Sequence, residues 1–329
     1  MPTISVVMPM YNASSRVGRA LESIVAQTFG DFELIVVDDG SSDDSVAIVQ
    51  AIIDSSCLND RARILRHDCN RGCAAARKTG MLAATGDYII HVDADDYVEP
   101  DYLEHLHSEA VRTDADVVIC DIVREWPCGK REVLSTPTGK TTDEYLAFAL
   151  SGEMYCSLCN KLIRRSIFVN NEIWPIEGLN MLDDKSVVVR VFYYAVSFAV
   201  VDKVLYHYDK GNSSITNQNR STHIDAFKRY NSLVDDFFDN HAHPRMIDEG
   251  LMSFKVISLS QKLIYSKSEI EKEESDFLSM LTLSDILTNK VCPPLYKIAI
   301  MSKKYGFGLL LMTLRLCVSL WQTKFLSGC

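Results

Sequence analysis

Short apolar runs alternate with helical patterns through the first part of the chain. The runs have the length and aliphatic content of buried strands, and they cover residues 4–8, 32–37, 63–65, 88–92 and 117–123. Between them, apolar residues recur every three or four positions, which predicts helices that pack one face on a sheet. This alternation with short connections predicts an α/β fold with a doubly wound, mostly parallel, Rossmann-like sheet.

The pattern changes in the second part of the chain. A further strand is predicted at residues 198–204, and from about Ser221 only helical periodicity remains. A polar run at residues 217–220 separates the two patterns. We therefore predict a principal domain over residues 1–217 and a smaller helical C-terminal region over residues 218–329.

Polar loops follow three of the predicted strands, at residues 9–12, 38–41 and 93–96. The carboxyl ends of parallel strands meet at one edge of a sheet, and ligands of open α/β sheets bind in the crevice outside that edge. We therefore expect the three loops to converge on one crevice.

The loop at residues 93–96 holds three carboxylates, those of Asp93, Asp95 and Asp96. Carboxylates this close repel one another unless a cation neutralises them, and Mg²⁺ or Mn²⁺ takes oxygen ligands while leaving positions for substrate phosphates. The pattern predicts that Asp93 and Asp95 hold a metal ion on a diphosphate. The alternative is a solvated turn that caps the next helix, a role we expect for Asp96.

Other residues of these loops suit a nucleotide. Tyr11 offers an aromatic face for a base, although a turn aromatic folded over the sheet edge is equally compatible with the sequence. Asp39 can accept a hydrogen bond from a ring N–H such as that of uracil. Arg77 follows a run of small residues and can meet phosphates or the base.

The same loops exclude two common nucleotide-binding classes. The first strand is not followed by a Gly-x-Gly-x-x-Gly sequence, and the chain has no lysine-bearing P-loop. This argues against a dinucleotide-dependent dehydrogenase and against an NTPase.

A second acidic pair, Asp183 and Asp184, precedes an apolar run. Acids in the first turn of a helix commonly act as caps. Alternatively, a carboxylate near a hydroxyl nucleophile accepts its proton as a general base.

Charge is distributed unevenly along the chain. The net charge of −10 argues against a nucleic-acid partner, yet residues 290–329 carry six cations and no acids. The apolar tail at about 293–329 is interrupted by Arg315, so we expect it to lie on an anionic membrane surface rather than to span the bilayer. The alternative is a helix that packs on the core of its own domain.

The chain begins directly with a predicted strand, without an export signal, and its ten cysteines lack the spacing of a disulfide framework. We therefore expect a reducing, cytoplasmic location, peripheral at the inner membrane face.

Five segments in this order resemble the family 2 inverting glycosyltransferases of the GT-A fold. They are VVMPMYN at 6–12, VVDDGSSD at 36–43, NRGCAAAR at 70–77, DADD at 93–96 and LDD at 182–184. The resemblance covers roughly the first 200 residues and does not extend beyond residue 220.

The resemblance implies a role for each matched residue. Tyr11 and Asp39 would line the base pocket, Asp93 would lie by the ribose, and Asp95 would bind the metal ion. The family's base is the second acid of a Glu-Asp pair; Asp183 replaces the glutamate here, so the base would be Asp184. The implied nucleotide-binding residues are Pro9, Tyr11, Asn12, Asp39, Arg77, Asp93 and Ala94.

The implied reaction is a single displacement assisted by Mn²⁺ or Mg²⁺. A sugar would move from a nucleotide-diphosphate sugar, expected to be a UDP-sugar, to an acceptor hydroxyl of a saccharide or lipid-linked saccharide. The pathway would be cell-surface polysaccharide or glycolipid synthesis.

Three other functions remain compatible with parts of the sequence. A signalling receiver domain also has adjacent acids at a strand end, but it would be shorter and needs no Asp93-Ala94-Asp95 sequence. A nucleotidyltransferase binds nucleotides and Mg²⁺ through carboxylates. A sugar-binding protein at the membrane surface that lacks activity is the third alternative.

Overall fold

The computed structural model describes residues 2–179, 181–210, 220–265, 270–289, 292–307 and 310–315. The chain forms two compact units, which are described separately. Unit 1 comprises Met1–Leu146 and Tyr155–Gly211, and unit 2 comprises Ala147–Met154 and Asn212–Cys329. The domain boundary predicted between residues 217 and 218 lies outside the described residues.

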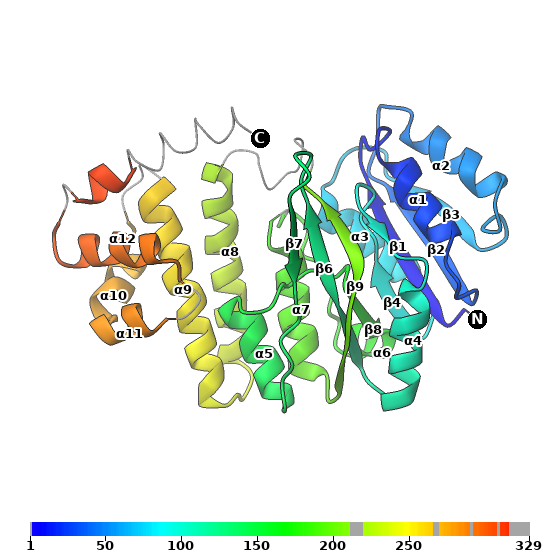
Figure 1. Ribbon diagram of the computed structural model, residues 1–329. Coiled ribbons are helices and arrows are strands. Elements are labelled where there is room, and N and C mark those ends of the chain that lie inside the picture. Colours follow the sequence, from blue (N-terminus) through cyan, green and yellow to red (C-terminus); the bar gives the residue numbers. More distant parts are fainter. Residues whose placement is uncertain are drawn as a thin grey trace. The chain divides into compact units, whose positions relative to one another are not determined.

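Within the described part of unit 1, nine strands form a single sheet (Figure 1), in the order β3-β2-β1-β4-β8-β6-β9-β5, with β7 beside β6. The strands are β1 (Ile4–Met10), β2 (Phe32–Asp38), β3 (Ala62–Arg66), β4 (Tyr88–His91), β5 (Tyr97–Val98), β6 (Val117–Glu125), β7 (Arg131–Leu134), β8 (Lys161–Arg164) and β9 (Phe198–Asp209). Six of them run in one direction, and β5, β7 and β8 run in the other. The predicted mostly parallel α/β sheet is confirmed.

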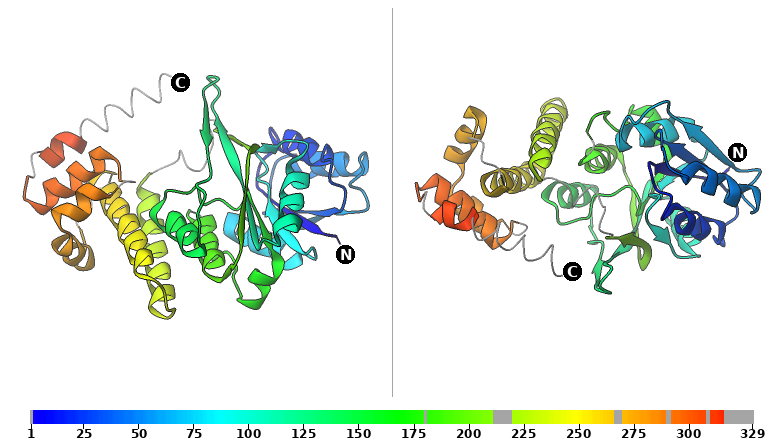
Figure 2. Two further views of the ribbon diagram at one scale, coloured as in Figure 1. Left: turned by 60° about the horizontal axis from the view of Figure 1, so that its bottom comes forward. Right: turned by 90° about the horizontal axis from the view of Figure 1, so that it is seen from above.

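Helices cover both faces of this sheet (Figure 2). They are α1 (Val17–Val25), α2 (Ser45–Asp54), α3 (Cys73–Ala83), α4 (Tyr102–Thr113), α6 (Arg165–Asn170) and α7 (Asp183–Tyr194), while α5 (Thr142–Ser151) continues from unit 1 into unit 2. Alternate residues of β1, including Ile4, Val6 and Met8, enter one core with α1, α2 and α4.

Helix α3 packs closely on the opposite face. A Cβ on Gly80 would overlap the Cγ1 of Val7 and lie 3.2 Å from the Cγ2 of Val37. Only a residue without a side chain allows this approach. Arg77 lies almost one turn earlier on the same helix, so the close packing also fixes Arg77 near the end of the sheet.

Two local features of unit 1 do not follow from the sequence pattern alone. Ser14 and Ser15 do not cap α1, because its N-cap is Arg16 without a capping side chain, and the Ser14 amide donates to Asp43 instead. By its sequence, the basic, apolar segment at residues 160–165 fits either a strand or the start of a helix. It is both, since β8 is antiparallel to β4 and β6 and leads directly into α6.

Unit 2 is helical, as predicted for the C-terminal region. Its helices are α8 (Arg220–Asp239), α9 (Arg245–Tyr265), α10 (Lys272–Met280), α11 (Leu283–Thr288) and α12 (Pro294–Lys304). Residues of α9 to α12 share a core that also receives Leu311. No helix in the described ranges has the length and apolarity needed to cross a membrane.

Three cations of the C-terminal segment bind carbonyl groups near the ends of helices in unit 2. Lys297 Nζ donates to the Leu287 carbonyl of α11 at 2.7 Å, and Lys304 Nζ donates to the Leu278 carbonyl of α10 at 2.9 Å. Arg315 Nε donates to the Leu263 carbonyl of α9 at 2.7 Å. Free carbonyl groups and the helix dipole make the C-terminus of a helix a favourable site for cations. The contacts of the described part of the tail therefore favour the alternative in which the tail packs on its own unit. Residues 316–329 of the predicted membrane segment lie outside the described ranges.

Candidate active site

The buried side chain of Arg77 brings the two acidic segments together. Its Nη2 lies 2.8 Å from Asp93 Oδ1 at the end of β4, and its Nη1 lies 2.5 Å from Asp183 Oδ2 and 2.9 Å from Asp184 Oδ1 at the start of α7. The Arg77 side chain is only 7% exposed. Although burial disfavours its charge, Asp184 and Asp93 raise the pKa of Arg77 well above its ordinary value.

Asp184 is held by the loop that precedes β8. Its Oδ2 accepts hydrogen bonds from Ser157 Oγ at 3.1 Å and from the Leu158 amide at 3.3 Å. Burial raises the pKa of the Asp184 carboxyl to about 7, with Arg77 opposing the shift and Asp183 and Asp93 adding to it. Both acids also lie in the first turn of α7, a position that suits acids at a helix start as well as a general base.

Asp96 does not cap α4, and this prediction was wrong. The N-cap of α4 is Asp101, whereas Asp96 is buried. Its Oδ2 accepts a hydrogen bond from the Tyr206 hydroxyl at 2.7 Å, and its Oδ1 accepts one from the Asp209 amide at 2.9 Å. The Asp93 amide donates to the same Tyr206 oxygen at 3.2 Å, so Tyr206 fastens the acidic loop to β9.

Asp95 lies at the more open side of this loop. Its side chain is 40% exposed and its Oδ2 lies 3.5 Å from Arg16 Nη1. Arg19 Nη2 donates to its main-chain oxygen at 3.2 Å. Burial and then the charge of Asp93 raise the pKa of Asp95 to about 6 against the opposing charge of Arg16.

The carboxylates of the acidic loop suit a metal ion only if a substrate supplies further ligands. Among the described residues, no group of three or more His, Cys, Asp or Glu side chains could hold a metal ion. Mg²⁺ commonly binds through only one or two carboxylates together with substrate phosphates and water. The charge of Asp93 adds to the effect of burial on the pKa of Asp95, and a cation between the two carboxylates would relieve their repulsion, so this pair fits an ion shared with a substrate.

Asp39 is buried and fastens the loop before α3. Its oxygens accept the Arg71 amide at 3.0 Å, the Gly72 amide at 2.7 Å and a contact from His67 Nδ1 at 2.7 Å. The other ring nitrogen of His67 lies 2.9 Å from Thr79 Oγ1 on α3. The Asp39 carboxylate, which was expected to accept a hydrogen bond from a nucleotide base, therefore already accepts hydrogen bonds from the protein itself.

The loops after β1 and β2 are joined by hydrogen bonds. The Asn12 amide donates to Ser41 Oγ at 2.9 Å, and Asn12 Oδ1 accepts the Ser42 amide at 2.9 Å. Asn12 itself has a positive φ of 45°. Beside it the Tyr11 side chain is 49% exposed, so much of its ring is open to a ligand.

The remaining predicted residues lie in the same region. Pro9 is in β1, paired with Val37, and Ala94 is buried next to Asp93. Asp39 therefore holds the segment that enters α3, and Arg77 on that helix holds the acids. Sequence reasoning missed Arg16, His67, Ser157 and Tyr206, which give no local signal because their partners lie far away in the chain.

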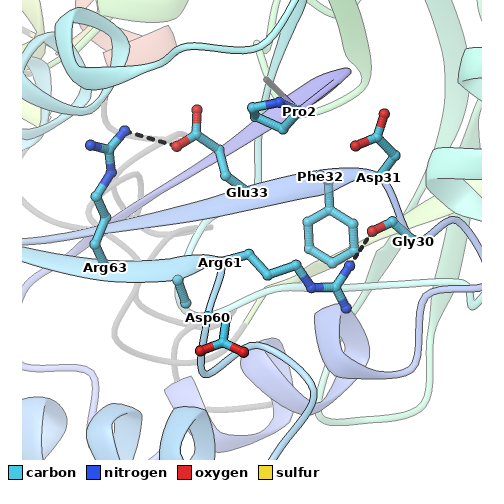
Figure 3. A pocket seen from close by; sticks show the side chains of 9 residues that line it. Pro2, Gly30, Asp31, Phe32, Glu33, Asp60, Arg61 and Arg63 are labelled. Atoms are coloured by element: carbon cyan, nitrogen blue, oxygen red, sulfur yellow. Dashed lines mark hydrogen bonds and ion pairs between the residues drawn. The ribbon is translucent and has the colours of Figure 1, made fainter.

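A surface pocket of about 570 Å³ lies elsewhere (Figure 3). Its lining residues are Pro2, Gly30, Asp31, Phe32, Glu33, Asp60, Arg61, Ala62 and Arg63. They cluster at the amino ends of β1, β2 and β3, opposite the acidic loops, and Arg63 pairs with Glu33 at 2.8 Å. This pocket does not belong to the candidate site.

The sequence of the chain is similar to those of known glycosyltransferases. The model of glycosyl transferase family 2 matches residues 5–170. The chain is 31% identical over 225 residues to the uncharacterized glycosyltransferase YibD of Escherichia coli, covering 66% of this chain and 64% of YibD. It is 30% identical over 233 residues to the succinoglycan biosynthesis protein ExoO of Rhizobium meliloti, covering 68% and 66%. The matches thus span slightly less than two thirds of these relatives.

Two solved structures share the fold. The TarS 1–349 structure from S. aureus in complex with UDP-GlcNAc has a TM-score of 0.65 at 18% identity and covers 92% of both chains. The mannosyltransferase PcManGT of Pyrobaculum calidifontis, in complex with GDP-Man and Mn²⁺, has a TM-score of 0.57 at 15% identity and covers 92% of this chain and 87% of its own. At these identities the likeness concerns the fold, and it confirms the predicted GT-A architecture.

Tyr206→Phe tests how the acidic loop is held. Because the hydroxyl satisfies both Asp96 and the Asp93 amide, its loss should lower hydrogen-exchange protection of the Asp93 and Asp96 amides at least tenfold, equivalent to about 1.4 kcal/mol. Tyr102→Phe is the matched control, since the Tyr102 hydroxyl is also buried but donates to the Cys159 carbonyl. Equal protection of the loop in both variants would contradict the assignment.

Proposed function

Because this chain belongs to glycosyl transferase family 2, we propose that it transfers a sugar from a nucleotide-diphosphate sugar to an acceptor hydroxyl with inversion at the anomeric carbon. The observation that carries the proposal is the gathering of Asp93, Asp183 and Asp184 around the single buried guanidinium of Arg77. The proposed setting is cell-surface polysaccharide or glycolipid synthesis, which the likeness to ExoO supports.

The proposed donor is a UDP-sugar. The fold is shared with TarS, which was solved with UDP-GlcNAc. The open ring of Tyr11 would stack on the base, and Pro9, Asn12, Asp39, Asp93 and Ala94 would line the nucleotide. Since Asp39 already accepts from Arg71, Gly72 and His67, its main proposed role is to shape the base pocket. Arg77 would mainly hold the carboxylates that it already binds rather than contact a phosphate.

Asp95, with Asp93, is the proposed site of Mn²⁺ or Mg²⁺. When bound, such an ion supplies positive charge that stabilises the leaving diphosphate. A pKa of about 6 leaves the Asp95 carboxylate mostly ionised near neutral pH and therefore able to bind a cation. Arg16, 3.5 Å from Asp95, would add a second positive charge beside the same phosphates.

Asp184 is the proposed general base. A base is most effective when its pKa lies near the working pH, and burial raises the pKa of Asp184 to about 7. Ser157 and the Leu158 amide hold one carboxylate oxygen, while Arg77 binds Asp183 and fixes the start of α7. Asp184 would accept the proton of an acceptor hydroxyl that attacks the face opposite the diphosphate, which inverts the anomeric configuration.

The donor can be found by screening nucleotide-sugars for Mn²⁺-dependent release of nucleoside diphosphate, with Asp95→Ala as control. With that donor, Asp184→Asn should lower kcat at least hundredfold and leave UDP affinity measured by calorimetry nearly unchanged. The wild-type kcat/KM should rise with pH through about 7 and then level off, since Asp184 must lose its proton.

Asp183→Asn is the matched control for the base, because it removes the neighbouring carboxylate on the same turn of α7. It should alter turnover less than Asp184→Asn does. Near-normal turnover of Asp184→Asn would overturn the assignment. Release of diphosphate from an NTP with a sugar phosphate would favour a nucleotidyltransferase, and no metal-dependent release from any nucleotide-sugar would favour a non-catalytic protein.

The proposed location is the cytoplasmic side of the membrane, with peripheral contact through unit 2 and the tail at about 293–329. Large apolar side chains on α11, α12 and the following turn support this contact: Leu283, Leu287, Leu295, Ile298, Tyr305 and Phe307 are exposed. Attraction to anionic lipid is weaker than the sequence suggested, because the side chains of Lys297, Lys304 and Arg315 donate to helix carbonyls.

Vesicle flotation tests this contact with the full chain. The protein should float with vesicles that contain phosphatidylglycerol, and the double variant Leu295→Ser, Ile298→Ser should float at least fivefold less. Leu82→Ser is the control, since Leu82 is comparably exposed on α3 of unit 1. A wild-type protein that stays in the soluble fraction would refute the membrane contact.

A further inference from the structure

Two tyrosines and two cations form a cluster near the carboxyl ends of β6 and β9. Arg124 Cζ lies 5.0 Å from the centre of the Tyr155 ring, and Lys210 Nζ lies 4.6 Å from the centre of the Tyr208 ring. The two ring centres are 6.4 Å apart. Arg124 and Tyr208 are register partners in the parallel pair of β6 and β9. We call these four residues the cation–tyrosine cluster.

The cluster adjoins the proposed base. Tyr155 begins the segment whose Ser157 and Leu158 hydrogen-bond Asp184 at 3.1 and 3.3 Å. Burial raises the pKa of Tyr155, and the charge of Asp184 is close enough to add to the shift. On the other side, Asp209, which directly precedes Lys210, donates its amide to Asp96 of the acidic loop at 2.9 Å. The cluster therefore lies between the base and the acidic loop, at the same sheet edge.

In the described part of the chain, the cluster leaves one buried donor unsatisfied, although the carboxylates of Glu132 and Asp96 lie near its two cations. Arg124 Nη1 lies 3.5 Å from Glu132, whose side chain is 46% exposed, and within the described residues Arg124 Nε is buried without a hydrogen-bond partner. Burial and the charge of Arg124 lower the pKa of Lys210. Each cation rests on a tyrosine ring, which helps to fix its position. An incoming anion would relieve the repulsion between the cations and satisfy the buried donor.

We propose that the cation–tyrosine cluster is the acceptor subsite and that the acceptor is a saccharide carrying a carboxylate or phosphate group. The inference rests on the proposed function, since it needs Asp184 to act on the acceptor hydroxyl. The donor diphosphate is the other source of an anion at this edge. The diphosphate already has Arg16 and the proposed metal residues, whereas Arg124 and Lys210 lie on the β6 and β9 side next to Tyr155.

Saturation-transfer NMR with the donor site filled distinguishes the two sources. The full chain is saturated with UDP and diamagnetic Mg²⁺ and titrated with octyl β-glucuronide or octyl β-glucoside, which differ only in a carboxylate that replaces a hydroxymethyl group. The wild-type protein should bind the glucuronide at least tenfold more tightly than the glucoside. Arg124→Gln and Lys210→Gln should each weaken the glucuronide at least fivefold and leave UDP affinity within twofold.

Lys130→Gln is the matched control. Lys130 Nζ also lies 4.6 Å from an aromatic ring, that of Trp126, on the same β6–β7 hairpin but outside the cluster. It should bind both glycosides as the wild type does.

Three results would overturn the inference. Equal or undetectable binding of the two glycosides would refute the proposal that the acceptor is anionic. A parallel loss of UDP affinity in Arg124→Gln and Lys210→Gln would assign the cluster to the donor diphosphate. A wild-type protein that does not bind UDP at all would defeat the proposed function itself, so the two failures are distinguishable.

Discussion

A single buried guanidinium holds this site together. Arg77 contacts Asp93 after β4 and Asp183 and Asp184 at the start of α7. An arginine does not lose its proton in a protein, so a buried one requires carboxylates, and buried carboxylates equally require a cation. Three carboxylates facing one guanidinium leave excess negative charge. Burial, and then the charges of Asp183 and Asp93, account for the raised pKa of Asp184.

The packing of the sheet supplies the geometry that this interaction needs. Gly80 lets α3 lie directly on β1 and β2, which fixes Arg77 near the sheet edge. Strand β8 is antiparallel to β4, so its start lies at the carboxyl end of β4. The residues before β8, including Ser157, therefore reach the same edge and hold Asp184. The antiparallel insertion thus contributes directly to the site.

The sequence predicted the parts of the fold that follow from local pattern. The buried strands read as apolar runs, and the acids that end them were correctly expected at one sheet edge, where Arg77 joins Asp93 to the second acidic pair. The partners of the buried polar side chains could not be predicted from local pattern. Arg77 was expected to meet phosphate or a base, but its acidic partner Asp183 is 106 positions away. Asp96 looked like a cap because Tyr206, which buries it, belongs to a distant strand.

The most direct measurement is the free energy of unfolding of the wild type and of Arg77→Gln as a function of pH. At pH 8 the variant should lose about 3–5 kcal/mol, because three carboxylates are left without their cation. Without the guanidinium, their folded-state pKa values rise above the unfolded values, so protonation favours the folded state and the loss should shrink towards pH 5. Arg112→Gln, which removes an exposed pair with Glu109, should leave the free energy of unfolding nearly unchanged at either pH. A loss for Arg77→Gln that is small, or the same at both pH values, would contradict the central role of this guanidinium.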